Sequence, residues 1–305
     1  MRVRAFVFVL FLSTLCRADI ISSIRETASQ GNFTQADATL LDYRTRNGIT
    51  PEYIEAVSWA ARGALAAKQY DQADSYAGMT IKLVREQLHN RDLDAEEHLP
   101  TALGAAIEVQ AQTQAARGAS EKAIALLKRN LVFYGKTSIG PRLQKNLNML
   151  TLVGQPAPAL QSTQYLGPKP PSLAQLKGSP TLMFFWAHWC GDCKQEGPVI
   201  ASLSSEFSSK GLRVIAPTQL YGYGAGGEDA APKKELAYIG QVWNHYYPAL
   251  KDVPVPVSKQ NFNSYGASTT PTLVLLDRSG RVSLYHPGVM PYSDLRGAIE
   301  KVLAN

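Results

Sequence analysis

Hydrophobic residues recur with different periods in the two halves of this chain. From Asp19 to about Leu150, apolar positions return every three or four residues, and Pro and Gly are scarce. This period is typical of amphipathic α-helices, which bury one face and expose the other. One such face, after Ala73, consists of Tyr76, Ala77, Ile81, Val84 and Leu88. Beyond about Val153 the apolar residues form short runs bounded by turn residues, and that pattern favours buried strands.

Three turns of one type interrupt the helical half, at residues 31–36, 68–73 and 118–123. Each places a tight turn before an alanine that starts an amphipathic run. Small alanine faces let helices pack closely, so we expect hairpins that resemble tetratricopeptide repeats. The aligned alanines are 37 and 50 residues apart, not a uniform spacing of about 34, so the hairpins are expected to be irregular. Stacked hairpins make a concave surface that binds a protein partner; the alternative is a helical bundle that only positions or dimerises the other half.

The second half begins in a Pro- and Gly-rich stretch, residues 153–171, which predicts a domain boundary. Buried strands are expected at 182–186, 212–216 and 272–276, with a small Pro-broken edge strand at 253–257. A hairpin turn at 277–280 leads into a last strand at 281–285. Expected helices are at 172–176, 199–207, 233–246 and 294–303. The order β-α-β-α-β-β-α, with an insertion at about 219–251, predicts an α/β fold with a mixed central sheet flanked by helices, preceded by an all-α helical-hairpin domain.

The first 18 residues have the pattern of a secretory signal peptide. Arg2 and Arg4 form a charged start, residues 5–12 are an apolar core too short to span a bilayer, and Ala18 ends a site for signal peptidase. We therefore expect an exported protein, periplasmic in a bacterium, with a signal peptide at 1–18, a helical repeat-like domain at 19–150 and a second domain at 151–305. The alternatives are a lipid anchor on Cys16, whose preceding residues match the lipidation pattern poorly, and an uncleaved anchor.

The composition suits an ordinary globular protein. A length of 305 residues, with 45% hydrophobic and 18% charged residues, fits about two domains with sizeable cores. The formal net charge of +6 falls to +3 when the predicted signal peptide is removed, because that segment carries three arginines and no acidic residue. No basic cluster is left, so the chain is not expected to bind nucleic acid.

Three cysteines are present, and removal of Cys16 with the signal peptide leaves only Cys190 and Cys193. A single close pair is no disulfide framework, so it is expected to carry chemistry. Cys190 follows a predicted strand and stands where a helix starts, and the free N–H groups of a helix N-terminus favour a thiolate. This predicts a redox dithiol in which Cys190 is the nucleophile and Cys193 resolves the mixed disulfide. Structural zinc is the alternative, but it needs four ligands, and the five histidines are scattered.

With these residues the chain resembles a known family, the thioredoxin-like thiol–disulfide oxidoreductases, and within it the exported TlpA and ResA type. The resemblance rests on Trp-Cys-Gly-Asp-Cys-Lys at 189–194, on Pro198 five residues past the second cysteine, and on Thr270-Pro271. It covers roughly residues 153–303 and implies a thioredoxin fold for them. It also implies an enzyme that exchanges disulfides with protein substrates, more often as a reductant, with no cofactor and with a redox donor in the membrane.

The resemblance also implies roles for residues outside the dithiol. Pro271 resembles the cis-proline that faces the dithiol in this fold, which would let the Thr270 backbone pair with a substrate strand. Glu196, three residues past Cys193, resembles a glutamate thought to help proton transfer in the TlpA and ResA branch; the alternative is a solvated helix residue. Many thioredoxins instead carry an Asp in the preceding strand, where this chain has Phe184.

Three further features lie close to the dithiol in sequence or in the expected fold. Trp189 is expected at the rim, in contact with substrate, and Trp186 in the core. His188 is expected as a polar rim residue, although an imidazole there could also stabilise the thiolate or line a metal route. Residues 222–227 fit a Gly-x-Gly-x-x-Gly pattern, yet they neither end a strand directly nor sit in a dinucleotide-binding unit. We therefore favour a flexible, tyrosine-bearing loop near the dithiol.

Two rival functions would use the same dithiol. A thiol peroxidase needs a Thr-x-x-Cys setting with an arginine nearby, and the three residues before Cys190 are Ala187, His188 and Trp189. A binding protein would recruit a partner through its helical half and carry Cu(I) on the dithiol, because thiolates suit soft metals. We favour the thiol–disulfide oxidoreductase, with no resident metal; the helical half either binds a protein partner or only positions or dimerises the other half.

Overall fold

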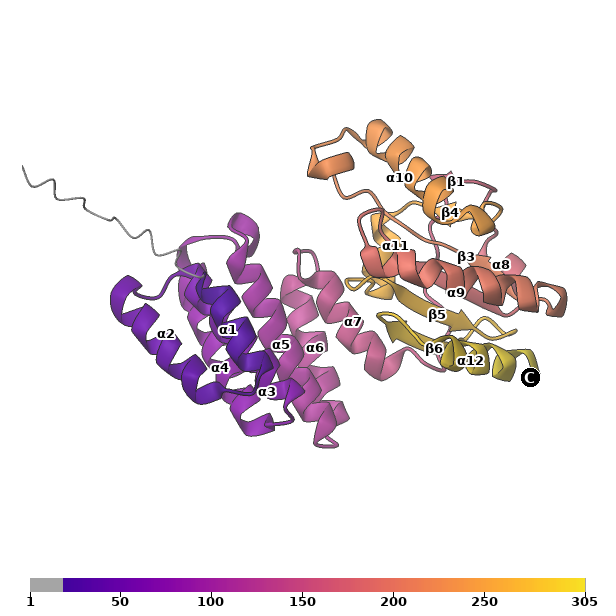
Figure 1. The fold of residues 1–305 in the computed structure, drawn as a ribbon. Coiled ribbons are helices and arrows are strands. Elements are labelled where there is room, and N and C mark those ends of the chain that lie inside the picture. The colour runs from indigo at the N-terminus through magenta and orange to yellow at the C-terminus, as the bar shows by residue number, and fades with distance from the viewer. Residues whose placement is uncertain (1–18, 305) are drawn as a thin grey trace, which may run out of the picture.

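The computed structural model describes residues 19–304 (Figure 1), so the signal peptide expected at 1–18 lies outside the described residues. A helical half comes first, as expected. Its helices are α1 Ile20–Ser29, α2 Phe33–Asn47, α3 Pro51–Ala66, α4 Tyr70–Gln87, α5 His98–Ala116, α6 Ser120–Tyr134 and α7 Gly140–Thr151. Two short 3-10 turns, Leu88–Asn90 and Leu93–Ala95, connect α4 to α5. Within residues 19–304, no helix has both the length and the apolar character needed to cross a membrane.

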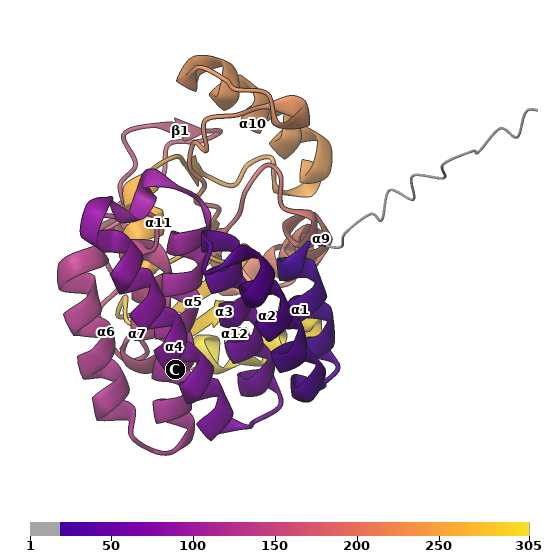
Figure 2. The ribbon, with the colours of Figure 1, turned by 90° about the vertical axis from the view of Figure 1, so that its left-hand side faces the viewer.

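The three predicted turns join α1 to α2, α3 to α4 and α5 to α6 as helical hairpins. Each turn contains one residue with a positive φ: Gly31 at 72°, Lys68 at 58° and Gly118 at 78°. Within residues 19–304, Lys68 is the one non-glycine residue with a positive φ. Figure 2, in which the helical half faces the viewer, shows α1 to α6 side by side. α7 closes the series by packing on α5 and α6.

Small side chains let these helices approach one another closely. Ala60, Ala61 and Ala64 on α3 are fully buried. Gly63 on the same helix lies against α1, where an added Cβ would come 2.6 Å from the Cβ of Ala28. Close approach of helix backbones, as the alanine faces predict, therefore holds the hairpins together.

The second half is built on a four-stranded sheet with the order β3-β2-β5-β6. β2 runs parallel to β3 and antiparallel to β5, so the sheet is mixed, as expected. The strands are β1 Tyr165–Leu166, β2 Thr181–Phe185, β3 Arg213–Ile215, β4 Val255–Pro256, β5 Thr272–Leu276 and β6 Val282–Pro287. The helices are α8 Leu173–Leu176, α9 Gly191–Phe207, α10 Pro232–Tyr246, α11 Lys259–Tyr265 and α12 Tyr292–Ala304. β4 is shorter than the edge strand expected at 253–257, and it pairs with β1 outside the central sheet.

Helices cover both faces of the sheet, and the side chains of β2 alternate between two cores. Leu182 and Phe184 pack on one face with the buried residues of α9 and α12. Met183 and Phe185 pack on the other face with the residues of α11 (Figure 1). The order β2, α9, β3, α10, β5, β6, α12 is that of the thioredoxin fold, and the expected fold class is confirmed.

The two halves meet where α7 packs against α11. Gly266 follows α11 with a φ of 61°, and an added Cβ would overlap the backbone of Gln144 and Lys145 on α7. The Asn148 side-chain amide donates a hydrogen bond of 3.4 Å to the carbonyl oxygen of Ser264. Because the closest contacts are between backbones, the end of the helical half is held tightly against the second face of the sheet.

Candidate functional site

The dithiol lies between the end of β2 and the start of α9. The helix begins at Gly191, earlier than the expected residue 199, so Cys190 is its N-cap and Cys193 lies in its first turn. The Cys190 sulfur accepts a hydrogen bond of 3.0 Å from the backbone N–H of Cys193. The two cysteines are joined in a disulfide with an S–S distance of 2.12 Å. In the reduced protein, this N–H and the helix dipole would favour a thiolate at Cys190.

The register of the sheet brings Thr270 and Pro271 to the dithiol. β5 runs antiparallel to β2 and pairs Thr272 with Phe185, so the chain just before β5 lies where β2 ends. The Thr270–Pro271 peptide bond is cis, as predicted. The carbonyl oxygen of Thr270 lies 3.4 Å from the Cys190 sulfur. The backbone before Pro271 is therefore in direct contact with the sulfur predicted to react.

The two tryptophans near the dithiol lie where the sequence predicts. Trp186 is fully buried, and its indole N–H donates a hydrogen bond of 3.1 Å to the carbonyl oxygen of Ala216. Trp189 is 50% exposed beside the nearly buried Cys190, and its ring stands edge-on to Tyr221 at 5.5 Å between centroids. An exposed aromatic side chain next to a reactive sulfur offers a surface for a substrate.

Glu196 is buried, so the alternative of a solvated helix residue is wrong. It lies on α9 one turn beyond Cys193, and 3% of it is exposed. Its Oε2 accepts a hydrogen bond of 3.4 Å from the backbone N–H of Met290, while its buried Oε1 has no hydrogen-bond partner. Burial raises the pKa of the Glu196 carboxyl. A buried carboxyl with a spare oxygen and a raised pKa is suited to exchange a proton.

His188 is also buried, and the expectation of a polar rim residue is wrong. It is 2% exposed, and the rings of Tyr221, Tyr223 and Tyr238 stand edge-on to its imidazole at 5.2 to 5.6 Å between centroids. The physical reason is that the insertion at 219–251 folds over it and excludes water. Burial lowers the pKa of His188, although Glu235 acts in the opposite direction. The imidazole is therefore enclosed away from the rim.

Sequence reasoning missed Glu235, a fully buried carboxylate on α10. It accepts hydrogen bonds from the backbone N–H groups of Tyr221 and Gly222, and it fastens the loop that covers His188. The sequence contains one indication of it: Glu235 lies in the first turn of α10 and Tyr238 one turn later, so both are on the same face of the helix. Because the N–H of Gly222 faces a carboxylate, the Gly-x-Gly-x-x-Gly segment is not shaped as a phosphate cradle.

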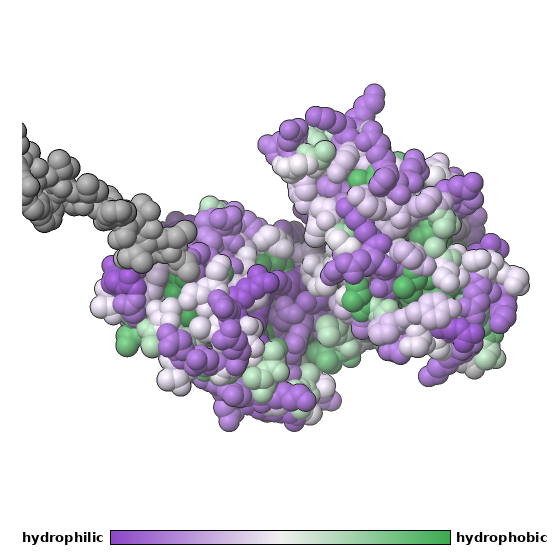
Figure 3. All heavy atoms as spheres, in the orientation of Figure 1, coloured by the Kyte–Doolittle hydropathy of each residue, from purple (hydrophilic) through white to green (hydrophobic). Residues whose placement is uncertain are grey.

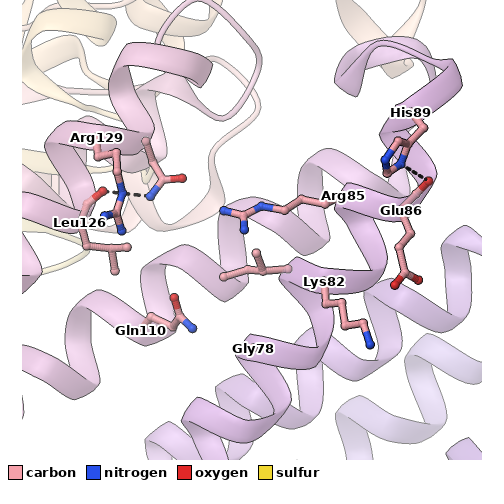
Figure 4. A pocket seen from close by; sticks show the side chains of 10 residues that line it. Gly78, Lys82, Arg85, Glu86, His89, Gln110, Leu126 and Arg129 are labelled. Atoms are coloured by element: carbon pink, nitrogen blue, oxygen red, sulfur yellow. Dashed lines mark hydrogen bonds between the residues drawn. The ribbon is translucent and has the colours of Figure 1, made fainter.

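The surface has a groove beside the dithiol and a separate hollow on the helical half. A groove of about 1150 Å³ runs past Trp189, Tyr221 and Thr270. A second hollow of about 480 Å³ lies on the helical half between α4, α5 and α6 (Figure 4), and its basic side chains are Lys82, Arg85, Arg129 and His89. The second hollow includes no dithiol residue. In the described part of the chain, no group of three or more His, Cys, Asp or Glu side chains is placed to hold a metal ion.

Comparison with known proteins places the similarity in the second half. Residues 152–301 match the Redoxin family model. The chain is 28% identical over 148 residues to the thioredoxin-like protein YneN of Bacillus subtilis, across 48% of this chain and 78% of that protein. It is 27% identical over 150 residues to the thiol-disulfide oxidoreductase ResA of Bacillus anthracis, across 49% of this chain and 78% of that protein.

Two further matches have similar extents. The thiol:disulfide interchange protein DsbE of Xylella fastidiosa is 29% identical over 155 residues, across 50% of this chain and 71% of that protein. A solved structure of a thiol:disulfide interchange protein from Chlorobium tepidum is 23% identical and covers 49% of this chain and 96% of that one, with a TM-score of 0.38.

Proposed function

Residues 152–301 are a Redoxin domain related to the ResA, YneN and DsbE proteins, and from this premise we propose that the chain is an exported thiol–disulfide oxidoreductase that reduces disulfides in protein substrates. One observation carries the proposal. The Cys190 sulfur, at the N-terminus of α9, lies 3.4 Å from the Thr270 carbonyl oxygen and beside the exposed Trp189. A nucleophile, a backbone that can hold a substrate strand and an exposed aromatic surface are thus adjacent.

The first step forms a mixed disulfide. The Cys190 thiolate attacks one sulfur of the substrate disulfide, the substrate S–S bond breaks, and the second substrate sulfur leaves as a thiolate that takes up a proton. The N–H of Cys193, 3.0 Å from the Cys190 sulfur, stabilises the attacking thiolate. Trp189 and the Thr270 backbone orient the substrate segment beside it.

The second step releases the reduced substrate. Cys193 loses its proton and attacks the Cys190 sulfur, which forms the Cys190–Cys193 disulfide and expels the remaining substrate thiolate. We assign Glu196 as the group that takes the Cys193 proton, since it lies one turn along α9 and has a buried oxygen without a partner. Two electrons pass from the dithiol to the substrate, so each cycle requires a dithiol donor, which we place at the membrane.

The roles of the two cysteines have a direct test. Cys193→Ser should accumulate a mixed disulfide at Cys190 when the reduced variant meets a protein disulfide, and mass spectrometry would identify the trapped chain. Cys190→Ala should lose disulfide exchange. Full exchange activity in Cys190→Ala would overturn the assignment of the nucleophile.

The direction of the reaction is set by the midpoint potential of the dithiol. Thiol alkylation across defined thiol buffers should give a value near that of thioredoxin, about −270 mV, for a reductant. A value near about −120 mV would instead identify an oxidant of exported thiols. The resemblance to the TlpA and ResA type implies a reductant, and the measured potential tests this direction.

Export rests on the pattern of residues 1–18, and we propose cleavage after Ala18. The mass of the mature chain isolated from a bacterial periplasm should then correspond to a start at Asp19. A lipid-modified N-terminus at Cys16, or a chain that keeps residue 1, would contradict cleavage. We further propose that residues 19–150 and 151–305 are the two domains of the mature protein.

A further inference from the structure

We propose that the helical half supplies one wall of the substrate groove, and that this groove takes an extended polypeptide segment with acidic side chains near its reacting cysteine. The proposal rests on the proposed function, in which the dithiol exchanges disulfides with protein substrates. It adds the partner surface: a polypeptide joined to Cys190 would touch the helical half and the α/β half together.

The groove joins the two halves in one continuous surface. Its volume is about 1150 Å³, and the dithiol side contributes Trp189, Tyr221 and Thr270. The opposite side is the loop between α6 and α7 with the first turns of α7, and it contributes Lys136, Ser138 and Gln144. Figure 3 shows the molecule hollowed between the two halves. Two sequence-distant halves therefore line the approach to Cys190.

The wall from the helical half is held in place by the contacts that surround it. The backbone N–H and the hydroxyl of Ser138 both donate to the carboxylate of Asp94, at 3.0 Å and 2.5 Å, which fastens the α6–α7 loop. Behind this loop, α7 packs against α11 through Gly266, where no Cβ would fit. A wall that is already ordered loses little conformational entropy when a segment binds to it.

The size and lining of the groove favour a polypeptide over a small molecule. Pockets for small molecules have volumes of about 300 to 1000 Å³ and are mostly apolar. This groove is larger, and it mixes polar side chains such as Gln144 and Gln219 with aromatic ones such as Trp189 and Phe262. A lining of mixed polar and aromatic side chains suits an extended chain, which presents backbone hydrogen-bonding groups and alternating side chains.

The charges of the groove favour a polypeptide with acidic residues next to its reacting cysteine. Lys136 lines it from the helical half and Lys259 from the α/β half, and both side chains are exposed. Among residues 19–304, neither lysine takes part in an ion pair. Asp94, the acidic residue of the lining, already accepts hydrogen bonds from Ser138. Asp94 keeps its negative charge, so Asp94, Lys136 and Lys259 give the lining a net charge of +1, which complements a segment with Asp or Glu near its cysteine.

The test uses the full mature chain with the change Cys193→Ser, in its reduced form, and three activated disulfides. Two are peptides of ten residues with a central cysteine joined to thionitrobenzoate, one with Asp and one with Lys on both sides of the cysteine. The third is N-acetylcysteine joined to thionitrobenzoate. In each case the Cys190 thiolate attacks the peptide or amino-acid sulfur, the S–S bond breaks, and thionitrobenzoate leaves as a coloured anion, because the thiol of lower pKa leaves faster.

The decisive variant is Lys136→Glu, and Lys128→Glu is its control with the same charge change. Lys128 is exposed on α6 outside the groove lining. With Lys136→Glu, the rate for the Asp peptide should fall about 2- to 5-fold, as expected for one exposed charge pair, and the rate for the Lys peptide should rise. The rate for N-acetylcysteine should not change, and Lys128→Glu should match the parent with all three compounds.

The outcomes separate this inference from the proposed function. Equal rates for Lys136→Glu and its parent with both peptides would overturn the inference, as would an equal fall with all three compounds. If the parent fails to react even with the N-acetylcysteine compound, the proposed function of the dithiol is wrong, and the inference that rests on it falls for that separate reason.

Discussion

The Oε1 atom of Glu235 lies 3.5 Å from the Nε2 atom of His188, and each side chain is only 1% exposed. His188 stands two residues before Cys190, and Glu235 belongs to α10, which lies within the 219–251 insertion. Their contact joins this insertion to the segment that carries the dithiol. Because Glu235 also accepts hydrogen bonds from the backbone N–H groups of Tyr221 and Gly222, one carboxylate fastens the loop and lies next to the imidazole, whose buried Nε2 has no hydrogen-bond partner.

This enclosure predicts a pH-dependent contribution to stability. Burial lowers the pKa of His188, so the unfolded chain takes up a proton near pH 6.5 and the folded chain does so only at lower pH. The stabilisation is complete above about pH 6.5 and is lost as the pH falls through the folded pKa. The groups that face the imidazole are Glu235, three tyrosines and Lys194.

His188→Gln should therefore cost about 1 to 3 kcal/mol of unfolding free energy at pH 7.5, and less at pH 5.5. Urea unfolding of the oxidised protein at several pH values measures the difference, which should shrink by at most about 1.4 kcal/mol per pH unit. The exposed His245 provides the matched control His245→Gln. If the loss of unfolding free energy in His188→Gln is the same at every pH, the imidazole is not enclosed in the folded state.

Burial of Glu196 predicts a stability effect of the opposite sign. Because burial raises the pKa of this carboxyl, its stabilising protonated form is fully present below about pH 4.5 and is lost as the pH rises through the folded pKa. Glu196→Gln, which stays neutral, should unfold at a higher urea concentration than wild type at pH 7.5 and lose that advantage near pH 4. The exposed Glu228 supplies the control Glu228→Gln. A destabilised Glu196→Gln at pH 7.5 would contradict this account.

The same residue predicts a slow second step. If Glu196 takes the Cys193 proton, Glu196→Gln should slow the conversion of the mixed disulfide to the Cys190–Cys193 disulfide by about 100-fold, at the low end of the range for general acid–base catalysis. Rapid mixing with a small disulfide, acid quench and mass spectrometry measure this conversion. In wild type its rate should rise with pH through the Glu196 pKa, and that inflection should vanish in the variant. An unchanged pH profile would exclude the role.

The left-handed backbone at Lys68 predicts a stabilising substitution. The equivalent turns carry Gly31 and Gly118, while Lys68 has a φ of 58°, which costs a side-chain-bearing residue about 1 kcal/mol. Glycine also raises the entropy of the unfolded chain, so Lys68→Gly should gain only about 0.5 kcal/mol of unfolding free energy. The reciprocal change, Gly118→Ala, should lose about 1 kcal/mol. Chemical denaturation tests the pair, and a loss of stability in Lys68→Gly would refute the expectation.

The contact of α11 with α7 predicts a position that tolerates no side chain. In Gly266→Ala the new Cβ would overlap the α7 backbone at Gln144 and Lys145, so unfolding free energy should fall by about 2 to 4 kcal/mol. Gly280 has a φ of 81° but open space around it, and Gly280→Ala should cost about 1 kcal/mol. Urea unfolding compares the two, and equal costs would mean that α7 can move away from α11.

Most of the fold could be predicted from local patterns. The apolar run at 182–186, the glycine and proline turns and the alanine faces each act over a few residues, so they identify strands and hairpins without knowledge of their neighbours. The apolar period predicts only the part of α9 beyond Pro198, because a proline inside a helix removes one hydrogen bond of the helix, whereas the position of Cys190 after the strand predicts its place at the helix start.

The order of the residues is enough to predict the chemistry: two cysteines at a helix start, a proline that faces them, and a fold that brings the three together. Which polar groups lose contact with water depends on tertiary packing. Three buried polar residues show this: Glu196, His188 and Glu235. Their neighbours in the sequence suggest partly exposed positions, but segments distant in the chain pack over them. The groove wall has the same origin, since the α6–α7 loop meets the dithiol side only after α7 docks on α11. Burial depends on the packing of segments that are far apart in the chain, so a local sequence pattern does not predict it.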